Sequence, residues 1–463
     1  MSCTPTVRQY AGLGLLVIAH GAIEGVEHHR RSGGYSGDDN RNILVAACAG
    51  QLYYMLPTAT AWTQIALPTG WSGTGYGCNV WSWVSYEINP DGSESPVDVL
   101  LLSNATDGMV MLRGDTMAVS TVTTPKKFGV IERYAERIWG GAINDDPDML
   151  VYSAPYDPTD WTANVEIPED GAGDVLQPSW DGDSFTALRA FGSQLIAFKR
   201  SRVWRVLGTD PGEYAFKEQY GGGAPYCGTI AVATERILML DKQGLVAYDG
   251  LAVQPFAQSY AKGVFRRMNV ASLDQANACL WHGKYYLALP LNSATSNNAV
   301  LIYDTVEGTW LLREDVAVEA FLPTENDLYF TSASTPGRIW RWQENSWLTG
   351  SATTGRAKWV TPWNDLGYRQ ISKGGFEVYV LCEVKQSATI TVSIQTEKKT
   401  KTKTLTVAPL TADEISAGKE YKQKRLHFGG TGRRFRLIIE GPDTGVAWRL
   451  VGGVLTVVEI DPD

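Results

Sequence analysis

Carboxylates grouped within a few residues of one another are the first candidates for chemistry in this sequence. Asp145, Asp146 and Asp148 fall in one turn-forming stretch, and Asp181 and Asp183 fall in another. Two carboxylates at a fixed separation can cleave a glycosidic bond, one as the acid and the other as the base or nucleophile. Aspartate beside Gly, Pro and Asn, as here, commonly hydrogen-bonds its own backbone. The sequence therefore favours turn-forming aspartates over catalytic ones.

Other chemical motifs are weak or missing. The Asp145–Asp148 stretch could give oxygen ligands to calcium, but a solvated loop is the favoured interpretation. The sequence has no Gly-x-Ser-x-Gly elbow to supply a hydrolase nucleophile. The glycine-rich stretch Gly221–Thr229 lacks the lysine of a phosphate-binding loop. His28 and His29 lie in a polar segment that we expect to be solvated. We assign no catalytic, metal-binding or cofactor-binding residue, and we expect no enzymatic activity.

The cysteines and the apolar stretches indicate the cellular compartment in which the protein is made and whether it spans a membrane. No cysteine pair has Cys-x-x-Cys or zinc-finger spacing, which predicts reduced and mostly buried thiols in a protein made in a cytosol. The six cysteines are Cys3, Cys48, Cys78, Cys227, Cys279 and Cys382. The apolar stretch Ala11–Ile23 is interrupted by His20 and predicts a buried strand. No run approaches the roughly 20 apolar residues of a membrane span.

The composition is typical of an all-β protein. The chain has 463 residues, of which 44% are hydrophobic and 20% charged, and it holds 47 Gly, 16 Trp and 21 Tyr. Glycine supplies turns with positive φ, whereas Trp and Tyr favour strands. Helical periodicity is nearly absent except around Thr411–Tyr421, where Thr411 and Glu414 have the spacing of a capping box.

The elements that would position any site are repeated. Three similar phrases, each an apolar strand, a polar turn and a second apolar strand, occupy Glu132–Ala154, Leu188–Gly208 and Ile230–Gly250. Aligned at the turn, related units read AGQLYYM, DGMVML, AERIWG, GSQLIAF, TERILML, HGKYYLAL and ENDLYFT. About seven units at spacings of roughly 40 to 50 residues predict a β-propeller.

The C-terminal part follows a different pattern. Six or seven strands that alternate apolar and polar residues predict a small β-sandwich over residues 351–463. This part holds 17 Lys and Arg against 12 Asp and Glu, whereas residues 1–350 hold 24 against 38. In Lys398–Thr404 and Lys422–Phe428 we expect one charged and one packed strand face. Arg433–Leu437 could pair with an acidic neighbour, including another copy.

The predicted organisation is an all-β chain of three parts. Residues 1–40 form an irregular segment, residues 41–350 a β-propeller body, and residues 351–463 a C-terminal β-sandwich. An acidic body argues against a nucleic-acid grip by the propeller.

Several phrases resemble a phage virion family, the propeller-containing tail proteins often described as stabilisation, hub or nozzle proteins of short-tailed phages. The resemblance begins at Pro125–Trp161 and continues through Val175–Phe216 and Gly228–Gly250. It rests on ERIWG, YSAPYDPTDW, VWRVLGTDP and GLVAYDG, and on the later YYLALP and LIYDTVEGTW. At the C-terminus, GRRFRLIIEG and AWRLVGGVLTVVE match the sandwich that follows such propellers. These phrases are structural, so no catalytic residue is carried over.

The resemblance implies a structural protein of the virion tail, assembled in the cytoplasm of a bacterial host. It implies a ring of about six copies between the portal or adaptor and the distal tail, through which DNA passes on ejection without specific binding. An acidic lumen would repel DNA and keep it mobile. We name Trp71, Tyr76, Trp81 and Trp161 as interface candidates, with blade packing as the equal or better explanation for each. The alternatives are a receptor-binding or glycan-binding propeller at the tail tip, and a glycan depolymerase.

Overall fold

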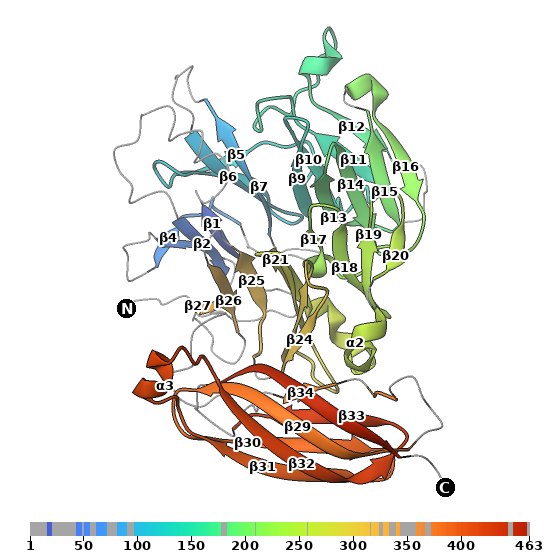
Figure 1. The fold of residues 1–463 in the computed structure, drawn as a ribbon. Helices are drawn as coiled ribbons and strands as arrows, with labels where there is room; N and C mark the ends of the chain where they lie inside the picture. The colour runs from blue at the N-terminus through green and yellow to red at the C-terminus, as the bar shows by residue number, and fades with distance from the viewer. Residues whose placement is uncertain are drawn as a thin grey trace. The chain divides into compact units, whose positions relative to one another are not determined.

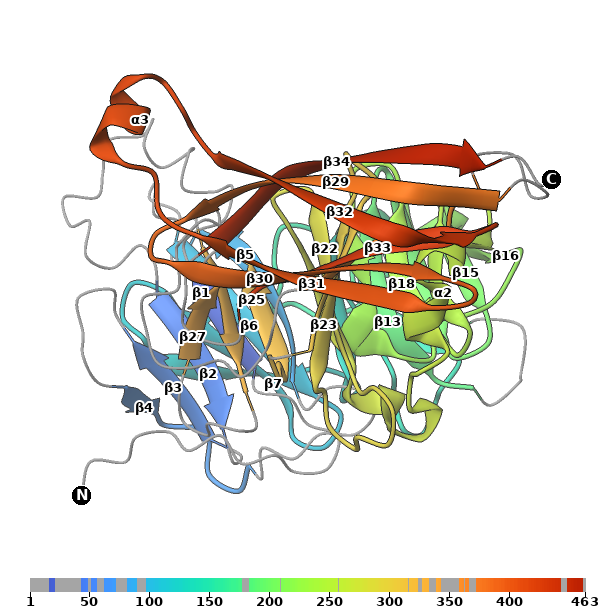
Figure 2. The ribbon, with the colours of Figure 1, turned by 60° about the horizontal axis from the view of Figure 1, so that its bottom comes forward.

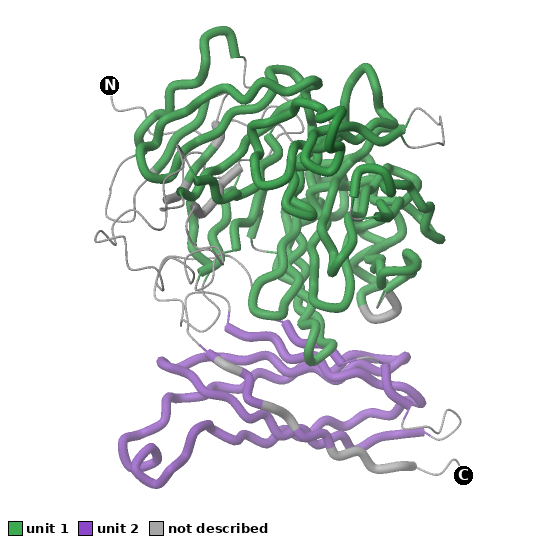
Figure 3. Tube along the Cα trace, turned by 90° about the horizontal axis from the view of Figure 1, so that it is seen from above, with its two compact units in different colours: residues 1–342 green, residues 343–463 purple. Residues whose placement is uncertain are grey.

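A computed structural model defines the fold of two compact units, residues 1–342 and residues 343–463, which we describe separately (Figure 3). The described residues are 16–20, 43–48, 51–55, 62–71, 81–89, 97–176, 183–208, 210–256, 258–314, 316–323, 327–332, 339–342, 358–361, 363–365, 372–442 and 448–460.

The described strands of the first unit form seven antiparallel sheets, here called blades 1 to 7. Blade 1 comprises β1 (Leu16–His20), β2 (Ile43–Cys48), β3 (Gln51–Met55) and β4 (Thr63–Ile65). Blade 2 comprises β5 (Ser82–Ile88), β6 (Val97–Asn104), β7 (Gly108–Arg113) and β8 (Val119–Val122). Blade 3 comprises β9 (Val130–Tyr134), β10 (Arg137–Gly141), β11 (Met149–Tyr152) and β12 (Gly173–Leu176). Blades 4 and 5 comprise β13 (Phe185–Phe191), β14 (Gln194–Lys199), β15 (Val203–Leu207) and β16 (Ala215–Gln219); and β17 (Ala231–Val232), β18 (Ile237–Asp241), β19 (Gly244–Tyr248) and β20 (Val253–Pro255). Blades 6 and 7 comprise β21 (Asn277–Trp281), β22 (Lys284–Leu289), β23 (Ala299–Asp304) and β24 (Trp310–Arg313); and β25 (Ala320–Pro323), β26 (Leu328–Thr331) and β27 (Ile339–Trp342).

Short helices lie between these strands. They are η3 (Pro168–Asp170), η4 (Pro211–Glu213), η5 (Cys227–Thr229), α2 (Gln258–Phe265) and η6 (Val270–Gln275). The helix α2 was not predicted, because eight residues that include Gly263 carry too little periodicity to stand out. Among the described residues, no helix has both the length and the apolar character needed to cross a membrane.

The blades follow one another around a ring, as Figure 1 shows. At four junctions the first strands of successive blades are neighbours: β5 contacts β9, β9 contacts β13, β17 contacts β21, and β21 contacts β25. Apolar clusters join blade 1 to blade 2 and blade 4 to blade 5. The strand β25 also contacts β1, which closes the ring. The unit is therefore a seven-bladed β-propeller, in which stacking buries both faces of each sheet.

The sequence predicted the right number of blades. In the first two blades, however, it aligned the phrase with a different strand of the blade than in the other five. In blades 3 to 7 the aligned phrases fall on the second strand, as in β10 and β14. In blades 1 and 2 the phrases AGQLYYM and DGMVML fall on the third strands, β3 and β7. In the sequence, two residues separate β2 from β3 and three separate β6 from β7, whereas more residues separate β1 from β2 and β5 from β6. The sequence pattern therefore marks the first short connection of each blade.

Residues 1–40 are not wholly irregular. The strand β1 lies within them and pairs with β2, from Leu16 opposite Ala47 to His20 opposite Ile43. This agrees with the strand expected in Ala11–Ile23. The boundary between the two units falls after Trp342, whereas the sequence pattern predicted it after residue 350.

Apolar clusters fill the interfaces between neighbouring blades. The cluster between blades 2 and 3 includes Phe128, which is fully buried. The ring of Phe128 packs directly against Gly140 of β10, and a Cβ added there would lie 2.4 Å from the Phe128 Cγ. Glycine is therefore required at position 140 by close packing between blades.

Replacing Gly140 by alanine should destabilise the propeller by about 1–3 kcal/mol, the usual effect of overpacking a core. The new methyl group would overlap the buried ring of Phe128. Denaturant unfolding would measure the change, with Gly222→Ala as the control, because a Cβ at Gly222 meets nothing within 4 Å. Equal stability of the two variants would contradict the packing argument.

The second unit is a β-sandwich of two antiparallel sheets, shown in Figure 2. One sheet has the order β28 (Lys358–Val360), β33 (Phe435–Glu440), β30 (Ala388–Thr396) and β31 (Thr400–Val407). The other has the order β32 (Lys422–Gly432), β29 (Ser372–Val384) and β34 (Trp448–Ile460). Alternate residues of β29, β30 and β33 are buried and form a common apolar core, which includes Val380, Val392 and Ile439.

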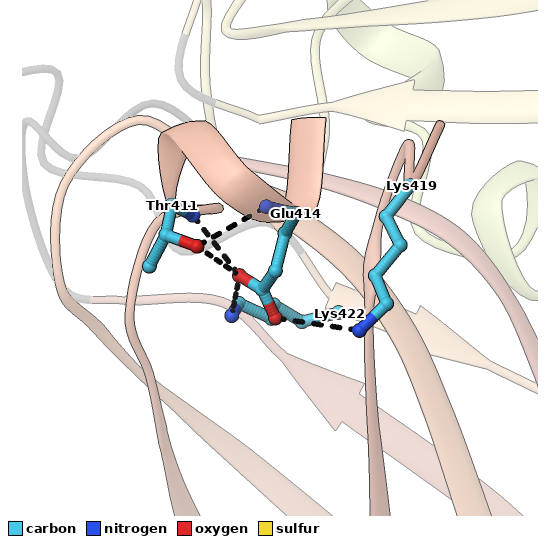
Figure 4. A network of polar contacts seen from close by, with 4 residues as sticks. All are labelled: Thr411, Glu414, Lys419 and Lys422. Carbon is cyan, nitrogen blue, oxygen red and sulfur yellow. Dashed lines mark hydrogen bonds and ion pairs between the residues drawn. The ribbon is translucent and has the colours of Figure 1, made fainter. Parts of the chain in front are cut away.

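The predicted capping box is confirmed at the short helix α3 (Ala412–Ser416) (Figure 4). The Thr411 hydroxyl accepts from the Glu414 backbone N–H at 3.3 Å, and the Glu414 carboxylate accepts from the Thr411 N–H at 3.0 Å. Ion pairs join the same carboxylate to Lys422 and Lys419. The Lys422 ammonium and the Thr411 N–H lower the pKa of Glu414 to about 2. The contribution of the ionised Glu414 carboxylate to folding stability is therefore present above its unfolded pKa of about 4.3 and is lost as the pH falls towards 2.

Replacing Thr411 by alanine should lower the stability of the sandwich by about 1 kcal/mol, because the Glu414 N–H loses its cap. Thr411→Ser keeps the hydroxyl and should be nearly neutral. Urea unfolding of both variants at neutral pH checks this prediction, and an equal loss in the serine variant would sink the capping explanation.

Candidate functional sites: acidic loops and a basic end

The described residues of the acidic stretches, Asp145, Asp146, Asp148 and Asp183, lie in loops between strands of blades 3 and 4. Asp146 forms an ion pair with Lys126, and Asp148 forms one with Lys199. Asp183 accepts from the Ser201 backbone N–H and hydroxyl, both at 3.3 Å. These carboxylates are bound by groups from other parts of the two blades.

Asp148 has a structural setting that the sequence did not reveal. It precedes β11 in blade 3, and its partner Lys199 ends β14 in blade 4. The Lys199 side chain is fully buried, while Asp148 keeps some solvent access. The Lys199 ammonium also lies 5.1 Å from the centre of the Phe185 ring. The pair therefore joins two blades through a buried charge.

Two of the predicted acidic residues do not join these contacts. Asp145 is exposed, and Asp181 lies outside the described residues. Within the described ranges, no three His, Cys, Asp or Glu side chains gather closely enough to hold a metal ion. The structure thus distributes the acidic stretches among separate ion pairs and turns.

The other sequence candidates are mostly part of the scaffold. In Gly221–Thr229 the Ala224 N–H donates to the Lys199 carbonyl, and the Thr186 hydroxyl donates to the Ala224 carbonyl, so the loop packs on blade 4. Cys227, Cys279 and Cys382 are buried free thiols, and burial raises the pKa of both Cys279 and Cys382. The side chains of Cys3, Cys48 and Cys78, like His28 and His29, lie outside what the structure describes.

The aromatic interface candidates pack within the propeller. Trp81 is buried and stacks on Trp71 with ring centres 6.1 Å apart. Trp161 packs on Phe128 at 5.1 Å and donates from its indole N–H to the Pro158 carbonyl. Tyr76 lies outside the described residues. More exposed aromatic residues, which sequence reasoning did not single out, are Tyr156, Tyr220, Trp83, Trp340, Trp359 and Trp363.

One end of the sandwich carries a cluster of cations, here called the basic end. It comprises the exposed residues Lys398, Lys399, Lys401, Arg433 and Arg434. Glu397 lies between β30 and β31, and Arg433 and Arg434 lie between β32 and β33. The Glu397 carboxylate joins these two connections, since it accepts from the backbone N–H groups of Arg433 at 2.7 Å and Arg434 at 3.0 Å. Burial opposes ionisation of Glu397, but those donors outweigh it and lower its pKa.

The basic end differs from the expected half-packed strand. Residues Lys398 to Thr404 are all exposed, and only Val407 of β31 is buried. The Lys403 ammonium lies 5.7 Å from the centre of the ring of Phe428, a residue of the apolar core. No ion pair joins the side chains of Lys399, Arg433 or Arg434 within the described part of the sandwich. Their charge is available to an acidic partner.

An acidic counterpart lies on the outer edge of blades 3 and 4. The acidic rim comprises the exposed residues Glu166, Glu169, Asp170, Asp210 and Glu213. These residues come from η3, η4 and adjoining loops, and the two short helices contact each other. The rim thus carries five carboxylates on two neighbouring loops.

A buried guanidinium fixes the rim in place. Arg137 of β10 is 3% exposed and donates to the carbonyls of Ser153 at 2.8 Å, Gly171 at 2.6 Å and Glu169. Its guanidinium also lies 5.2 Å from the centre of the Tyr152 ring. Because these contacts use backbone carbonyls, the carboxylates of η3 stay directed to solvent.

Comparison with known proteins adds no function. The chain matches no protein-family model, and a search of curated proteins found no match. It is similar to a chain in the crystal structure of the Mitotic Checkpoint Complex, with a TM-score of 0.42 and 12% identity over 74% of this chain and 93% of the other. It is also similar to BamB from Moraxella catarrhalis, with a TM-score of 0.38 and 9% identity over 65% of this chain and 82% of the other. A third similar structure is the β-propeller domain of Cps50 (Swd1) from Myceliophteria thermophila, with a TM-score of 0.38 and 10% identity over 65% of this chain and 93% of the other. Scores this low carry no argument about activity or partners.

Proposed function

We propose that this chain is a structural, non-enzymatic protein of a bacteriophage tail. Several copies form a ring around the DNA channel, between the head-proximal adaptor and the distal tail. The proposal is supported by the resemblance of Pro125–Trp161 and the later phrases to tail hub and nozzle proteins. A seven-bladed propeller followed by a sandwich is compatible with such a scaffold.

The observation that carries the proposal is the separation of charge between the two units. The basic end of the sandwich presents five exposed cations, and the acidic rim of the propeller presents five exposed carboxylates. In a ring of identical subunits, one surface of each copy meets a different surface of the next copy. We propose that the basic end of one copy contacts the acidic rim of its neighbour.

Complementary charge of this kind gives specificity and faster association, and it is screened by salt. The ring is therefore expected to assemble more readily at low ionic strength. The acidic propeller body would at the same time repel DNA in the lumen, so the DNA would pass without being held.

Reversing charge at the basic end should block association between copies. We expect Arg433→Glu combined with Arg434→Glu to weaken self-association by at least about tenfold, since like charges would then face each other. Sedimentation equilibrium measures the mass against the 50.7 kDa of one chain. The control is Lys242→Glu with Lys262→Glu, which makes the same change in net charge at two exposed propeller residues.

A rescue experiment tests the pairing itself. Adding Glu169→Arg and Asp170→Arg to the double glutamate variant should restore association. Equal association of wild type, reversed and control variants would contradict the proposed contact. Wild-type protein that stays at the mass of one chain at all concentrations, and is absent from the tails of assembled particles, would contradict the ring.

A further inference from the structure

The junction between blades 6 and 7 encloses side-chain oxygens that have no hydrogen-bond partner. Glu319 is 7% exposed, and neither of its carboxylate oxygens has a partner. The Asn297 Oδ1 and the Thr331 Oγ1 are also buried and unpartnered. All four atoms are oxygens able to accept a hydrogen bond or to coordinate a cation.

Backbone contacts place the three residues at one junction. The Asn297 side-chain Nδ2 donates to the Gln275 carbonyl at 2.6 Å and to the Val318 carbonyl at 2.9 Å. The next residue, Glu319, donates from its backbone N–H to the Thr331 carbonyl at 2.8 Å. Because the Asn297 amide nitrogen is held by two carbonyls, the orientation of its side chain is fixed with Oδ1 unpaired.

A buried carboxylate with no compensating charge or donor is unfavourable. Burial correspondingly raises the pKa of Glu319, and no other group opposes the shift. A bound cation would supply the missing positive charge, and hard cations take ligand sets made of carboxylate, amide and hydroxyl oxygens.

The junction between blades 3 and 4 shows what is missing here. There Asp148, just before the third strand of blade 3, pairs with Lys199 at the end of the second strand of blade 4. Near the corresponding positions, Asn297 lies two residues before the third strand of blade 6, and Thr331 ends the second strand of blade 7. At the blade 6–7 junction a short hydroxyl therefore occupies the place of the lysine, and no described side chain pairs with the Glu319 carboxylate.

We propose that Glu319, Asn297 and Thr331 bind a hard cation, such as Ca²⁺ or Na⁺, at the junction of blades 6 and 7. The ion takes the role that Lys199 has between blades 3 and 4. Since the next strand, β25, contacts both β21 and β1, the ion would strengthen the closure of the propeller ring. This inference concerns the propeller itself and does not depend on the proposed tail function.

The test is thermal unfolding of the full chain after chelation and dialysis, followed by addition of CaCl₂ or of NaCl against choline chloride at equal ionic strength. One of the two ions should raise the melting temperature by about 5 °C at concentrations well above its dissociation constant. Equilibrium dialysis of that ion should give one bound per chain. The salt that is effective identifies the cation.

The variant Glu319→Gln should abolish the shift, and Thr331→Val, which keeps the side-chain shape, should reduce it. Glu132→Gln is the matched control, because Glu132 is also an inter-blade carboxylate with a raised pKa but pairs with Arg189 at 3.5 Å. This control should keep the full cation response.

Two results would overturn the site. In the first, no cation raises the melting temperature and Glu319→Gln raises it at neutral pH, as expected for a buried acid without a ligand. In the second, a cation stabilises wild type, Glu319→Gln and Thr331→Val equally, which would place binding elsewhere. If Glu319→Gln does not fold, the Thr331→Val comparison with wild type decides between these outcomes.

Discussion

Replacing Trp139 by alanine should destabilise the propeller by about 3–5 kcal/mol, the range for removing a large buried aromatic side chain. Trp139 is fully buried between blades 3 and 4. Its ring centre lies 5.0 Å from that of Tyr152 and 4.8 Å from that of Tyr214. Its indole N–H donates to the Tyr134 carbonyl at 3.2 Å. The substitution therefore removes an apolar anchor shared by two blades.

Denaturant unfolding followed by tyrosine and tryptophan fluorescence would measure this loss. Trp83→Ala is the matched control, because Trp83 is 39% exposed and should contribute much less. Trp139→Phe should recover much of the loss, since it keeps an aromatic ring in the cluster. A loss for Trp83→Ala as large as for Trp139→Ala would mean that inter-blade packing is not what stabilises this region.

Replacing Asp148 by asparagine should destabilise the chain by about 3 kcal/mol, because it removes the carboxylate charge beside a buried ammonium. Lys199 has no exposed side-chain surface, whereas Asp148 is 19% exposed. Lys199→Met should therefore have a smaller effect, because the carboxylate that it leaves behind can still be hydrated. The larger effect is expected from the more exposed partner.

A double-mutant cycle separates this asymmetry from simple loss of packing. Combining Lys199→Met with Asp148→Asn should give a variant more stable than Asp148→Asn alone, since no buried charge is left. Chemical denaturation at neutral pH would measure all four proteins. If Lys199→Met alone were as damaging as Asp148→Asn, the ion pair would not be controlled by the burial of the lysine.

Local patterns predicted what depends on neighbours in sequence. The capping box at Thr411 and Glu414 needs residues three apart, and it formed as predicted. The β-propeller and sandwich followed from strand periodicity and turn residues, and the structure has both. The predicted strand alignment of blades 1 and 2 was wrong, because a short turn in the sequence indicates a hairpin but not which of the hairpins of a blade it belongs to.

The sites depend on residues far apart in sequence, which single positions do not reveal. Lys199 and Asp148 are 51 residues apart, and nothing local distinguishes this aspartate from its neighbours. The basic residues of Lys398–Thr404 were visible, but the contact of Glu397 with the Arg433 and Arg434 backbone, 36 and 37 residues away, was not. Nothing local in the sequence distinguishes Glu319, because its burial and its lack of partners depend on how neighbouring blades pack.

We propose that copies of this chain form a ring coaxial with a phage tail. A low-resolution map of the assembled particle, with an antibody bound to the C-terminal sandwich, tests it most directly. We expect a closed ring of density around the DNA channel, below the adaptor, with antibody label repeated around its circumference. Label confined to separate copies at the distal tip would contradict the ring and support a receptor-binding propeller, and the absence of label from the tail would contradict both.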